Sequence, residues 1–151
     1  IKTKRPAYIF DVDGTLANVD PYIHLVRGPN KDYNAFHEAS IDAMPNVHVV
    51  EMLNNVFFDK MDVIIVTSRM EKWRGLTSCW LAKNDIGHNA LYMRKNEDFR
   101  SDYEVKSDIL NEIKKYWNIV HAVDDNPSII TLWGANGIQT TKIGTWDGNR
   151  S

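Results

Sequence analysis

Two aspartates that stand one residue apart directly follow a short apolar run near the start of the chain. Asp11 and Asp13 come after residues 7–10, a run with the length and composition of a buried strand in a parallel sheet. Because side chains alternate along a strand, both carboxylates point the same way where the extended geometry continues. Gly14 then permits a sharp turn. A strand that ends in an ordinary Asp-Gly turn is one interpretation. A site for Mg²⁺, which prefers oxygen ligands, is the other.

A second set of reactive residues follows later in the chain. Thr67 and Ser68 offer hydroxyl groups, Lys106 offers a cation, and the neighbours Asp124 and Asp125 form a second acidic pair. Hydroxyl and backbone N–H groups at a helix start can bind phosphate oxygens, and Mg²⁺ can neutralise carboxylates and phosphoryl oxygens together. A carboxylate beside such a metal can attack phosphorus, while a second carboxylate protonates the leaving oxygen and later activates water. The combination suits phosphate-ester chemistry.

The elements that must position these residues alternate between strand and helix. Apolar runs predict strands over residues 7–10, 62–66, 90–93, 119–123 and 139–143. Amphipathic spacing and capping signals predict helices over residues 33–39, 45–57, 71–84, 103–117 and 127–133. Asp32 is the predicted N-cap of the first of these helices, and Gly87 is predicted to end the third. This alternation predicts a mostly parallel five-stranded sheet with helices on both faces, which binds ligands at the carboxyl ends of its strands. Asp11, Thr67, Arg94 and Asp124 all follow strands, so we expect them to meet at that edge.

Size and composition limit the class of protein. The chain has 151 residues, 43% hydrophobic content, 25% charged content and a formal net charge of −2, which is typical of one soluble globular domain without a general attraction to polyanions. Cys79 is the single cysteine, which excludes an internal disulfide and a cysteine-rich zinc site, and we expect it to be buried. No membrane span or signal peptide is evident. The sequence predicts a cytoplasmic protein, in the host cytoplasm if it is virally encoded.

Taken as a set, these motifs resemble those of the haloacid-dehalogenase (HAD) superfamily of aspartate-nucleophile phosphatases. The matching segments are Asp11-Val12-Asp13-Gly14-Thr15, Val66-Thr67-Ser68, Lys106 and Val123-Asp124-Asp125-Asn126. The resemblance implies an α/β, three-layer Rossmann-like fold with a small cap or none. It also implies that Asp11 is the nucleophile and Asp13 the general acid and base, with Thr67 and Ser68 as phosphate ligands. Lys106 would then stabilise the charge of nucleophile and phosphate.

The same resemblance implies how a metal is held. Mg²⁺ would be bound by Asp11, by the backbone carbonyl of Asp13, and by the pair Asp124 and Asp125, of which we expect Asp125 to be the direct ligand. The carboxyl side chain of Asp13 also favours a phosphatase over a dehalogenase, because a leaving alcohol needs an acid.

A closer resemblance, to the 3′-phosphatase domain of bacteriophage polynucleotide kinases, covers most of the chain. It rests on Lys31-Asp32-Tyr33-Asn34-Ala35-Phe36-His37-Glu38 with Pro45-Asn46, Thr67-Ser68-Arg69 with Trp73-Arg74, Thr77 and Trp80-Leu81, Leu91-Tyr92-Met93-Arg94, and Asp98-Phe99-Arg100-Ser101-Asp102 with Val105-Lys106. Those enzymes remove a 3′-phosphate from a nucleic-acid end. The resemblance implies that Arg69, Arg94 and Arg100 grip the substrate and that Asp102 supports Lys106.

Two departures from that family bear on function. Asp124-Asp125-Asn126 stands where relatives commonly have Asp-Asp-Arg, which removes one basic contact. The glycine-rich P-loop of the kinase half is absent from the sequence. We therefore expect one phosphatase domain over residues 1–151 that lacks 5′-kinase activity. It would act alone, beside a kinase partner, or as part of a longer protein.

The sequence thus predicts a Mg²⁺-dependent phosphomonoesterase that acts through an Asp11 phosphoenzyme on the 3′-phosphate of DNA or RNA ends. The insertion over residues 17–45 is too short for a large cap, and an open entrance admits a polymer end. Two alternatives stay open: a phosphatase of free nucleotides or other small phosphate esters, and a non-catalytic HAD-like binding module. A response-regulator receiver is rejected, because its acidic pair would precede the accepting aspartate.

Overall fold

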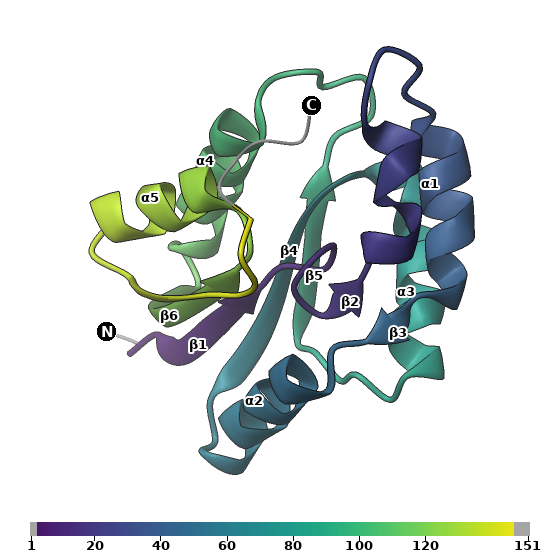
Figure 1. Ribbon diagram of the computed structural model, residues 1–151. Helices are drawn as coiled ribbons and strands as arrows, with labels where there is room; N and C mark the ends of the chain where they lie inside the picture. Colours follow the sequence, from purple (N-terminus) through teal and green to yellow (C-terminus); the bar gives the residue numbers. More distant parts are fainter. Residues whose placement is uncertain (1–2, 147–151) are drawn as a thin grey trace.

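A five-stranded parallel sheet forms the centre of the molecule, in the order β5-β4-β1-β6-β7 (Figure 1). The computed structural model describes residues 3–146. The strands are β1 (Arg5–Phe10), β4 (Asp62–Met70), β5 (Ala90–Arg94), β6 (Trp117–Asp124) and β7 (Gln139–Lys142). The five predicted strands are therefore present, and β1, which carries the acidic motif at its end, lies in the middle.

Helices cover both faces of the sheet and make it the middle of three layers (Figure 1). α2 (Val47–Phe58) and α3 (Arg74–Lys83) pack on the face that buries Phe10 and Ile65, while α4 (Asp102–Ile113) and α5 (Pro127–Ala135) pack on the face that buries Ile9 and Ile64. Neighbouring residues of β1 and β4 thus point into two separate apolar cores, as expected for central parallel strands. The predicted three-layer α/β fold is confirmed.

A small insertion lies between β1 and α2. The short strands β2 (Ala17–Asn18) and β3 (Met44–Pro45) pair antiparallel at its base, and the 3-10 helices η1 (Asp20–Val26) and η2 (Ser40–Asp42) flank α1 (Tyr33–Ala39). Asp32 caps α1 as predicted, because its Oδ1 accepts a hydrogen bond of 3.0 Å from the backbone N–H of Ala35. We call residues 19–43 the cap segment; its size agrees with the expected small cap.

The backbone of the sheet brings the predicted site residues to one edge. Phe10 is aligned with Ile65 on β4 and with Val123 on β6, so the acidic motifs that follow β1 and close β6 stand side by side. The backbone N–H of Asp11 donates to the carbonyl of Val123 at 3.1 Å, which continues the ladder one residue further. None of the helices within residues 3–146 has the length and apolarity needed to cross a bilayer.

Two helix boundaries differ from the expectation. Pro45 belongs to β3, and α2 begins only after Asn46. The helix predicted to reach Trp117 ends at Ile113, and Trp117 opens β6. A single apolar residue at helical spacing cannot be distinguished from the first residue of a strand, so the predicted helix extended too far, to Trp117.

The predictions for α3 also need correction at two positions. The helix ends at Lys83, and the left-handed residue beyond it is Asp85 (φ 55°), whereas Gly87 lies later in the loop. Cys79 is exposed, not buried, because α3 turns Thr77, Trp80 and Leu81 towards the interior. Cys79 therefore falls on the solvent side of the helix.

Candidate active site

Three carboxylates meet at the carboxyl end of the sheet. Asp11, Asp124 and Asp125 are each buried, and one oxygen from each lies within 4.8 Å of the others. We call these three residues the acidic cluster. A donor set made only of carboxylate oxygens matches the preference of hard divalent cations such as Mg²⁺. The cluster therefore has the ligand chemistry of a divalent-metal site.

Gly14 is required for the acidic cluster to close. Its φ of +81° is a left-handed conformation that side chains rarely adopt, and a Cβ atom built there would lie 2.0 Å from Oδ2 of Asp125. The glycine thus turns the chain after β1 and leaves the space that the Asp125 carboxylate fills. Thr15, one residue later, donates its hydroxyl to Oδ2 of Asp11 at 3.0 Å.

Lys106 on α4 supplies a cation to the acidic cluster. Its Nζ donates to Oδ1 of Asp11 at 3.0 Å and to Oδ2 of Asp124 at 2.8 Å, and the side chain is only 2% exposed. Burial acts to lower the pKa of Lys106, but Asp11 and Asp124 outweigh it and raise that pKa. Burial and the charge of Asp124 raise the pKa of Asp11 well above its usual value. One lysine does not balance three carboxylates, so the cluster has the charge needed to hold a divalent cation.

Asp13 lies in different surroundings, beside Arg69 on β4. The guanidinium pairs with both carboxylate oxygens, through Nε to Oδ2 at 2.9 Å and through Nη2 to Oδ1. Burial alone would raise the pKa of Asp13, but the charge and hydrogen bonds of Arg69 lower it. Arg69 also donates to the hydroxyls of Thr77 and Ser40, at 3.0 and 3.2 Å. Neither Ser40 nor Thr77 was predicted to contact Arg69, because sequence patterns do not show which side chain a small polar residue will meet.

Thr67 and Ser68 lie in the last part of β4, not at a helix start, because the strand continues to Met70. The hydroxyl of Thr67 accepts from the backbone N–H of Arg69 at 3.2 Å. Oγ of Ser68 is buried without a hydrogen-bond partner in the described part of the chain. A buried hydroxyl without a partner is costly, so a ligand atom at this position would satisfy it.

The buried guanidinium of Arg94 holds the loop over residues 95–101. It donates to the carbonyl of Ser68 at 2.8 Å, to the carbonyls of Asp98 and Arg100 at 2.9 and 2.6 Å, and to Oδ1 of Asp102 at 2.6 Å. Asp102, which the resemblance assigns to the support of Lys106, pairs with Arg94, whereas Lys106 pairs with Asp11 and Asp124 of the acidic cluster.

Arg100 is also engaged within the protein. Its guanidinium pairs with Asp98 at 2.9 Å and with Asp108 at 2.7 Å on the surface of the molecule. The structure thus brings Asp11, Asp13 and Arg69 together at one edge, whereas Arg94 and Arg100 shape the neighbouring loop.

His37 on α1 is a buried residue, and the sequence identifies it only as part of the segment over residues 31–38. Its ring lies 5.1 Å from that of Trp73 and 5.2 Å from that of Phe36, and its Nδ1 has no hydrogen-bond partner among the described residues. Burial lowers the pKa of His37 to about 4, although the charge of Asp13 acts in the opposite direction. Through Ser40 and His37, the cap segment contacts Arg69 and comes within electrostatic range of Asp13.

The sequence profile of the family described as "Polynucleotide kinase PNKP phosphatase domain" matches residues 5–147. The chain belongs to this family. The expected HAD-type fold and the resemblance to polynucleotide kinase phosphatases are thereby confirmed, and the family implies a phosphatase, which is a hydrolase.

Solved structures agree on the fold. A chain in the "Structure of Pnkp1/Rnl/Hen1 complex" superposes with a TM-score of 0.81 at 24% identity, covering 97% of this chain and 49% of that one. The Bacillus anthracis class C acid phosphatase with tungstate bound gives 0.72 at 14% identity, over 94% of this chain and 67% of that one. A putative beta-phosphoglucomutase from Thermotoga maritima gives 0.65 at 17%, over 96% and 88%. The present chain spans about half the length of the Pnkp1/Rnl/Hen1 chain that it matches.

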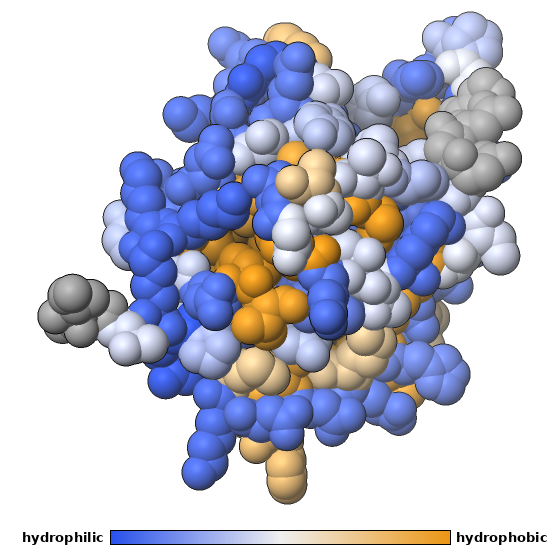
Figure 2. Space-filling view, turned by 90° about the vertical axis from the view of Figure 1, so that its left-hand side faces the viewer, coloured by the Kyte–Doolittle hydropathy of each residue, from blue (hydrophilic) through white to orange (hydrophobic). Residues whose placement is uncertain are grey.

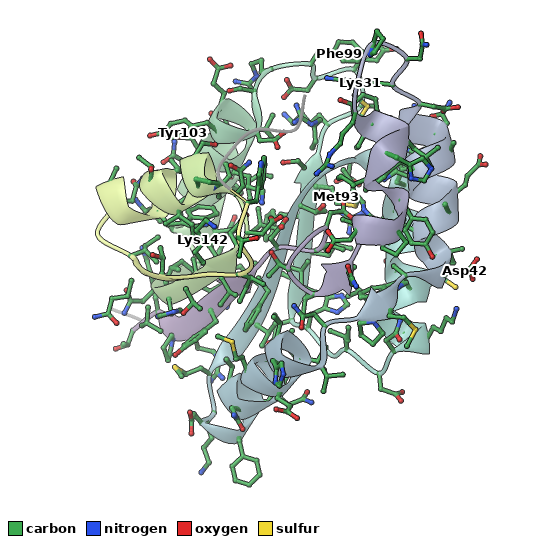
Figure 3. The ribbon with its side chains drawn as sticks, viewed as in Figure 1. Lys31, Asp42, Met93, Phe99, Tyr103 and Lys142 are labelled. Carbon is green, nitrogen blue, oxygen red and sulfur yellow. The ribbon has the colours of Figure 1, made fainter. Side chains whose placement is uncertain are left out.

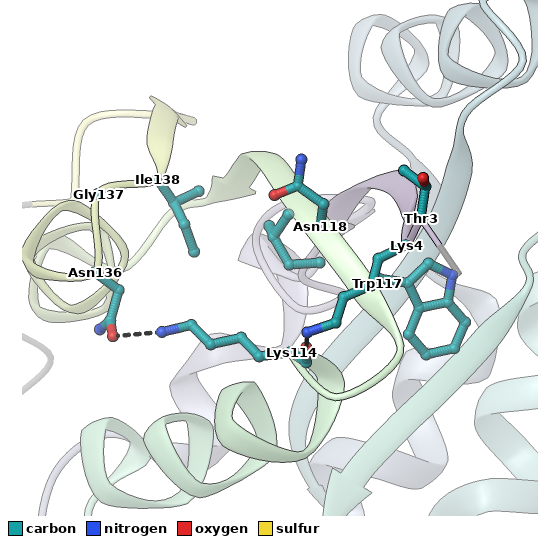
Figure 4. A pocket seen from close by; sticks show the side chains of 9 residues that line it. Thr3, Lys4, Lys114, Trp117, Asn118, Asn136, Gly137 and Ile138 are labelled. Carbon is teal, nitrogen blue, oxygen red and sulfur yellow. Dashed lines mark hydrogen bonds between the residues drawn. The ribbon is translucent and has the colours of Figure 1, made fainter. Parts of the chain in front are cut away.

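Two hollows lie away from the acidic cluster of this PNKP-family domain. One of about 560 Å³ opens where β1 and β6 begin, and Lys4, Lys114 and Ile119 are among its lining residues (Figure 4). The second hollow, of about 530 Å³, runs along β5 beside α4. On the side of the molecule that lies at the left of Figure 1, apolar side chains are surrounded by hydrophilic ones (Figure 2). Neither hollow is lined by Asp11, Asp124 or Asp125.

Proposed function

We propose that this chain is a Mg²⁺-dependent polynucleotide 3′-phosphatase that acts through an aspartyl-phosphate on Asp11. The observation that carries the proposal is the acidic cluster with Lys106 at the carboxyl end of the sheet, together with the Ser68 hydroxyl on β4, which has no hydrogen-bond partner among the described residues. Family membership gives the phosphatase class. The site residues give the chemistry.

In this proposal Asp11 is the nucleophile. Thr15 and Lys106 each donate to one of its oxygens, which fixes the carboxylate in place before the substrate arrives. Thr67 and Ser68 bind the phosphoryl oxygens. A carboxylate oxygen of Asp11 attacks phosphorus while the bond to the 3′-oxygen breaks, and the leaving oxygen takes a proton from Asp13. Asp13 then removes a proton from water, which attacks the acyl phosphate and releases inorganic phosphate and free Asp11.

The pair between Asp13 and Arg69 fits a change of partners within this cycle. Paired with Arg69, Asp13 is held as a carboxylate, the form that removes a proton from water. To protonate the leaving oxygen it must first be released from Arg69. We propose that the substrate phosphate takes over the guanidinium, so that the predicted role of Arg69 in gripping the substrate and its observed contact with Asp13 belong to different stages.

The metal would be held by Asp11, by Asp125 and by the backbone carbonyl of Asp13. Asp125 lies against Gly14, immediately after that carbonyl, which supports it as the direct ligand. Asp124 accepts hydrogen bonds from Lys106 and from the backbone N–H of Asn126, at 2.8 and 3.0 Å, which suits an orienting role. When bound, Mg²⁺ supplies neutralisation of the carboxylate and phosphoryl charges.

The choice of a polynucleotide end as substrate rests on the family and on the small cap segment. The family is that of polynucleotide kinase phosphatase domains, and a similar solved chain belongs to the "Pnkp1/Rnl/Hen1 RNA repair complex". We propose that residues 1–151 act as one phosphatase domain on DNA or RNA ends in the cytoplasm. Any 5′-kinase activity would come from a partner or from a segment outside these residues.

The test is phosphate release from a single-stranded oligonucleotide that carries phosphate at the 3′ or at the 5′ end, assayed with Mg²⁺ and with excess EDTA. We expect release only from the 3′ end and only with Mg²⁺. Parallel assays with a 3′-mononucleotide address the alternative. Turnover of the mononucleotide without turnover of the oligonucleotide would contradict the proposed substrate, and no turnover of any ester would contradict an enzymatic role.

A further inference from the structure

Phe99 is an aromatic residue whose side chain lies outside the protein core. Its side chain is 83% exposed at the tip of the loop over residues 95–101, between β5 and α4. Burying a phenylalanine stabilises the folded state, and this side chain contributes little of that stabilisation. Single exposed apolar residues are common on proteins, so exposure alone assigns no role. The backbone that carries Phe99 is what distinguishes it.

That backbone is held on both sides of Phe99. Nη1 of Arg94 binds the carbonyls of Asp98 and Arg100, the two residues that flank it, at 2.9 and 2.6 Å. The Arg100 side chain then reaches back to Asp98, at 3.0 and 2.9 Å, and across to Asp108 on α4. An aromatic side chain on a braced loop loses little conformational freedom when a partner packs against it.

The braced loop is tied directly to the phosphate-binding end of the sheet. The same Arg94 guanidinium donates through Nε to the carbonyl of Ser68, so one side chain joins Ser68 to both neighbours of Phe99. Tyr103, 39% exposed in the first turn of α4, precedes Lys106 on the same helix by three positions. Figure 3 shows Phe99 and Tyr103 on the upper side of the molecule, towards which β4 and β5 point.

The charges around Phe99 favour a base over a phosphodiester as its partner. Residues 94–104 carry four carboxylates and three cations, and the guanidinium groups of Arg94 and Arg100 already pair with carboxylates. This stretch therefore offers a nucleic-acid backbone no excess of positive charge, whereas the face of a base is uncharged and needs none. Stacking on aromatic side chains is the usual way in which single-stranded nucleic acid is held without sequence preference.

We propose that Phe99 is a stacking platform for a base near the 3′ end of a single-stranded substrate whose terminal phosphate lies at Thr67 and Ser68. The proposal rests on the polynucleotide 3′-phosphatase function and specifies how a polymer differs from a small ester at this site. Phe99 touches only the parts of the substrate that a small ester lacks, so it contributes to binding and not to the chemical step.

The test compares the wild type with Phe99→Ala on two substrates, a short 3′-phosphorylated single-stranded oligonucleotide and p-nitrophenyl phosphate. We expect Phe99→Ala to lower kcat/KM for the oligonucleotide by about 5- to 150-fold, through KM, because stacking is worth roughly 1–3 kcal/mol per base. Turnover of p-nitrophenyl phosphate should not change. Phe99→Tyr, which keeps the ring, should retain the wild-type kcat/KM for the oligonucleotide. Phe99→Leu, which keeps bulk without the ring, should lower it.

The matched control is Phe58→Ala, which removes a phenylalanine that is 88% exposed at the end of α2, before β4 begins and so at the opposite edge of the sheet. It should leave both substrates unaffected. Equal kcat/KM for wild type and Phe99→Ala on the oligonucleotide, or equal losses on both substrates, would overturn the stacking proposal while leaving the 3′-phosphatase in place. A wild-type protein that hydrolyses only p-nitrophenyl phosphate would overturn both.

Discussion

Asp11 lies among two further carboxylates and one lysine, whereas Asp13, two residues later in the chain, faces a single arginine. The first environment raises the pKa of its aspartate, through burial and the charge of Asp124. The second lowers it, because Arg69 outweighs burial. Different elements build the two environments: α4 and β6 supply the partners of Asp11, and β4 supplies Arg69 for Asp13.

The balance of nearby charges, more than position in the sequence, makes the pKa values of Asp11 and Asp13 shift in opposite directions. The acidic cluster holds three carboxylates against Lys106 and needs a further cation, while Asp13 and Arg69 balance each other. Sites that push two titratable groups in opposite directions are typical of acid–base assignments.

Asp11→Asn should lower the rate of phosphate release by about 10³-fold or more, because the proposed nucleophile is gone. The fold should be at least as stable as the wild type, since the change removes one of three clustered like charges. Phosphate release and urea unfolding measure the two effects, with the exposed Asp59→Asn as control. Full activity of Asp11→Asn would contradict the assignment of the nucleophile.

Arg69→Met should destabilise the protein by about 3 kcal/mol, because it leaves the half-buried carboxylate of Asp13 without its cation. Adding Asp13→Asn to the same chain should recover part of the loss. Urea unfolding at pH 7 measures both. Arg74→Met serves as control: Arg74 pairs with Glu71 on the surface, where the loss should stay below about 1 kcal/mol. An equal loss in both arginine variants would count against the buried pair.

Mg²⁺ should stabilise the folded protein, by about 2.7 kcal/mol at one hundred times its dissociation constant, because only the folded acidic cluster can bind it. Thermal unfolding with Mg²⁺ and with excess EDTA measures the shift. Asp125→Asn should remove most of the shift, and the exposed Asp59→Asn should keep it. A shift of the same size in Asp125→Asn would mean that the cation binds elsewhere.

His37 should make stability depend on pH at the cap segment. Its folded pKa of about 4 lies below the usual 6.5, so the unfolded chain binds a proton that the folded one does not, and stability falls as pH drops from about 6.5 towards 4. Asp13, Arg69 and Lys72 are the charged groups that act on it. His37 should thus make the free energy of unfolding about 2 kcal/mol lower at pH 5 than at pH 7. His37→Phe, which keeps an aromatic ring beside Trp73, should lack this contribution.

Urea unfolding at the two pH values measures the His37 effect. The exposed His24→Phe should retain the wild-type pH dependence. An unchanged pH dependence in His37→Phe would show that another group causes the loss of stability in acid.

The sheet and its acidic edge were predictable because they depend on local patterns. The apolar runs before Asp11, Thr67 and Asp124 marked the strands, and the rule for parallel sheets then placed their ends together. Asp32 was recognised as a cap because capping depends on a few neighbouring residues.

The contacts of long side chains were not predictable in the same way. Arg69 lies on β4 whereas Asp13 follows β1 in the turn, and Arg94 reaches Ser68 across a register shift between β4 and β5. Periodicity fixes which face a residue occupies but not the register between strands or the partner that a guanidinium finds. Asp102 was therefore assigned to Lys106, its neighbour one helical turn away, when its partner is Arg94 on β5.

The way in which Arg94 holds its loop has a consequence for how the protein can diverge. Three of the groups that Arg94 binds are backbone carbonyls, of Ser68, Asp98 and Arg100, which every amino acid provides. The side chain at position 99 can thus be exchanged without loosening the loop that presents it. Under the proposed stacking role, substrate preference can therefore change at this tip while the acidic cluster and Lys106 stay unchanged.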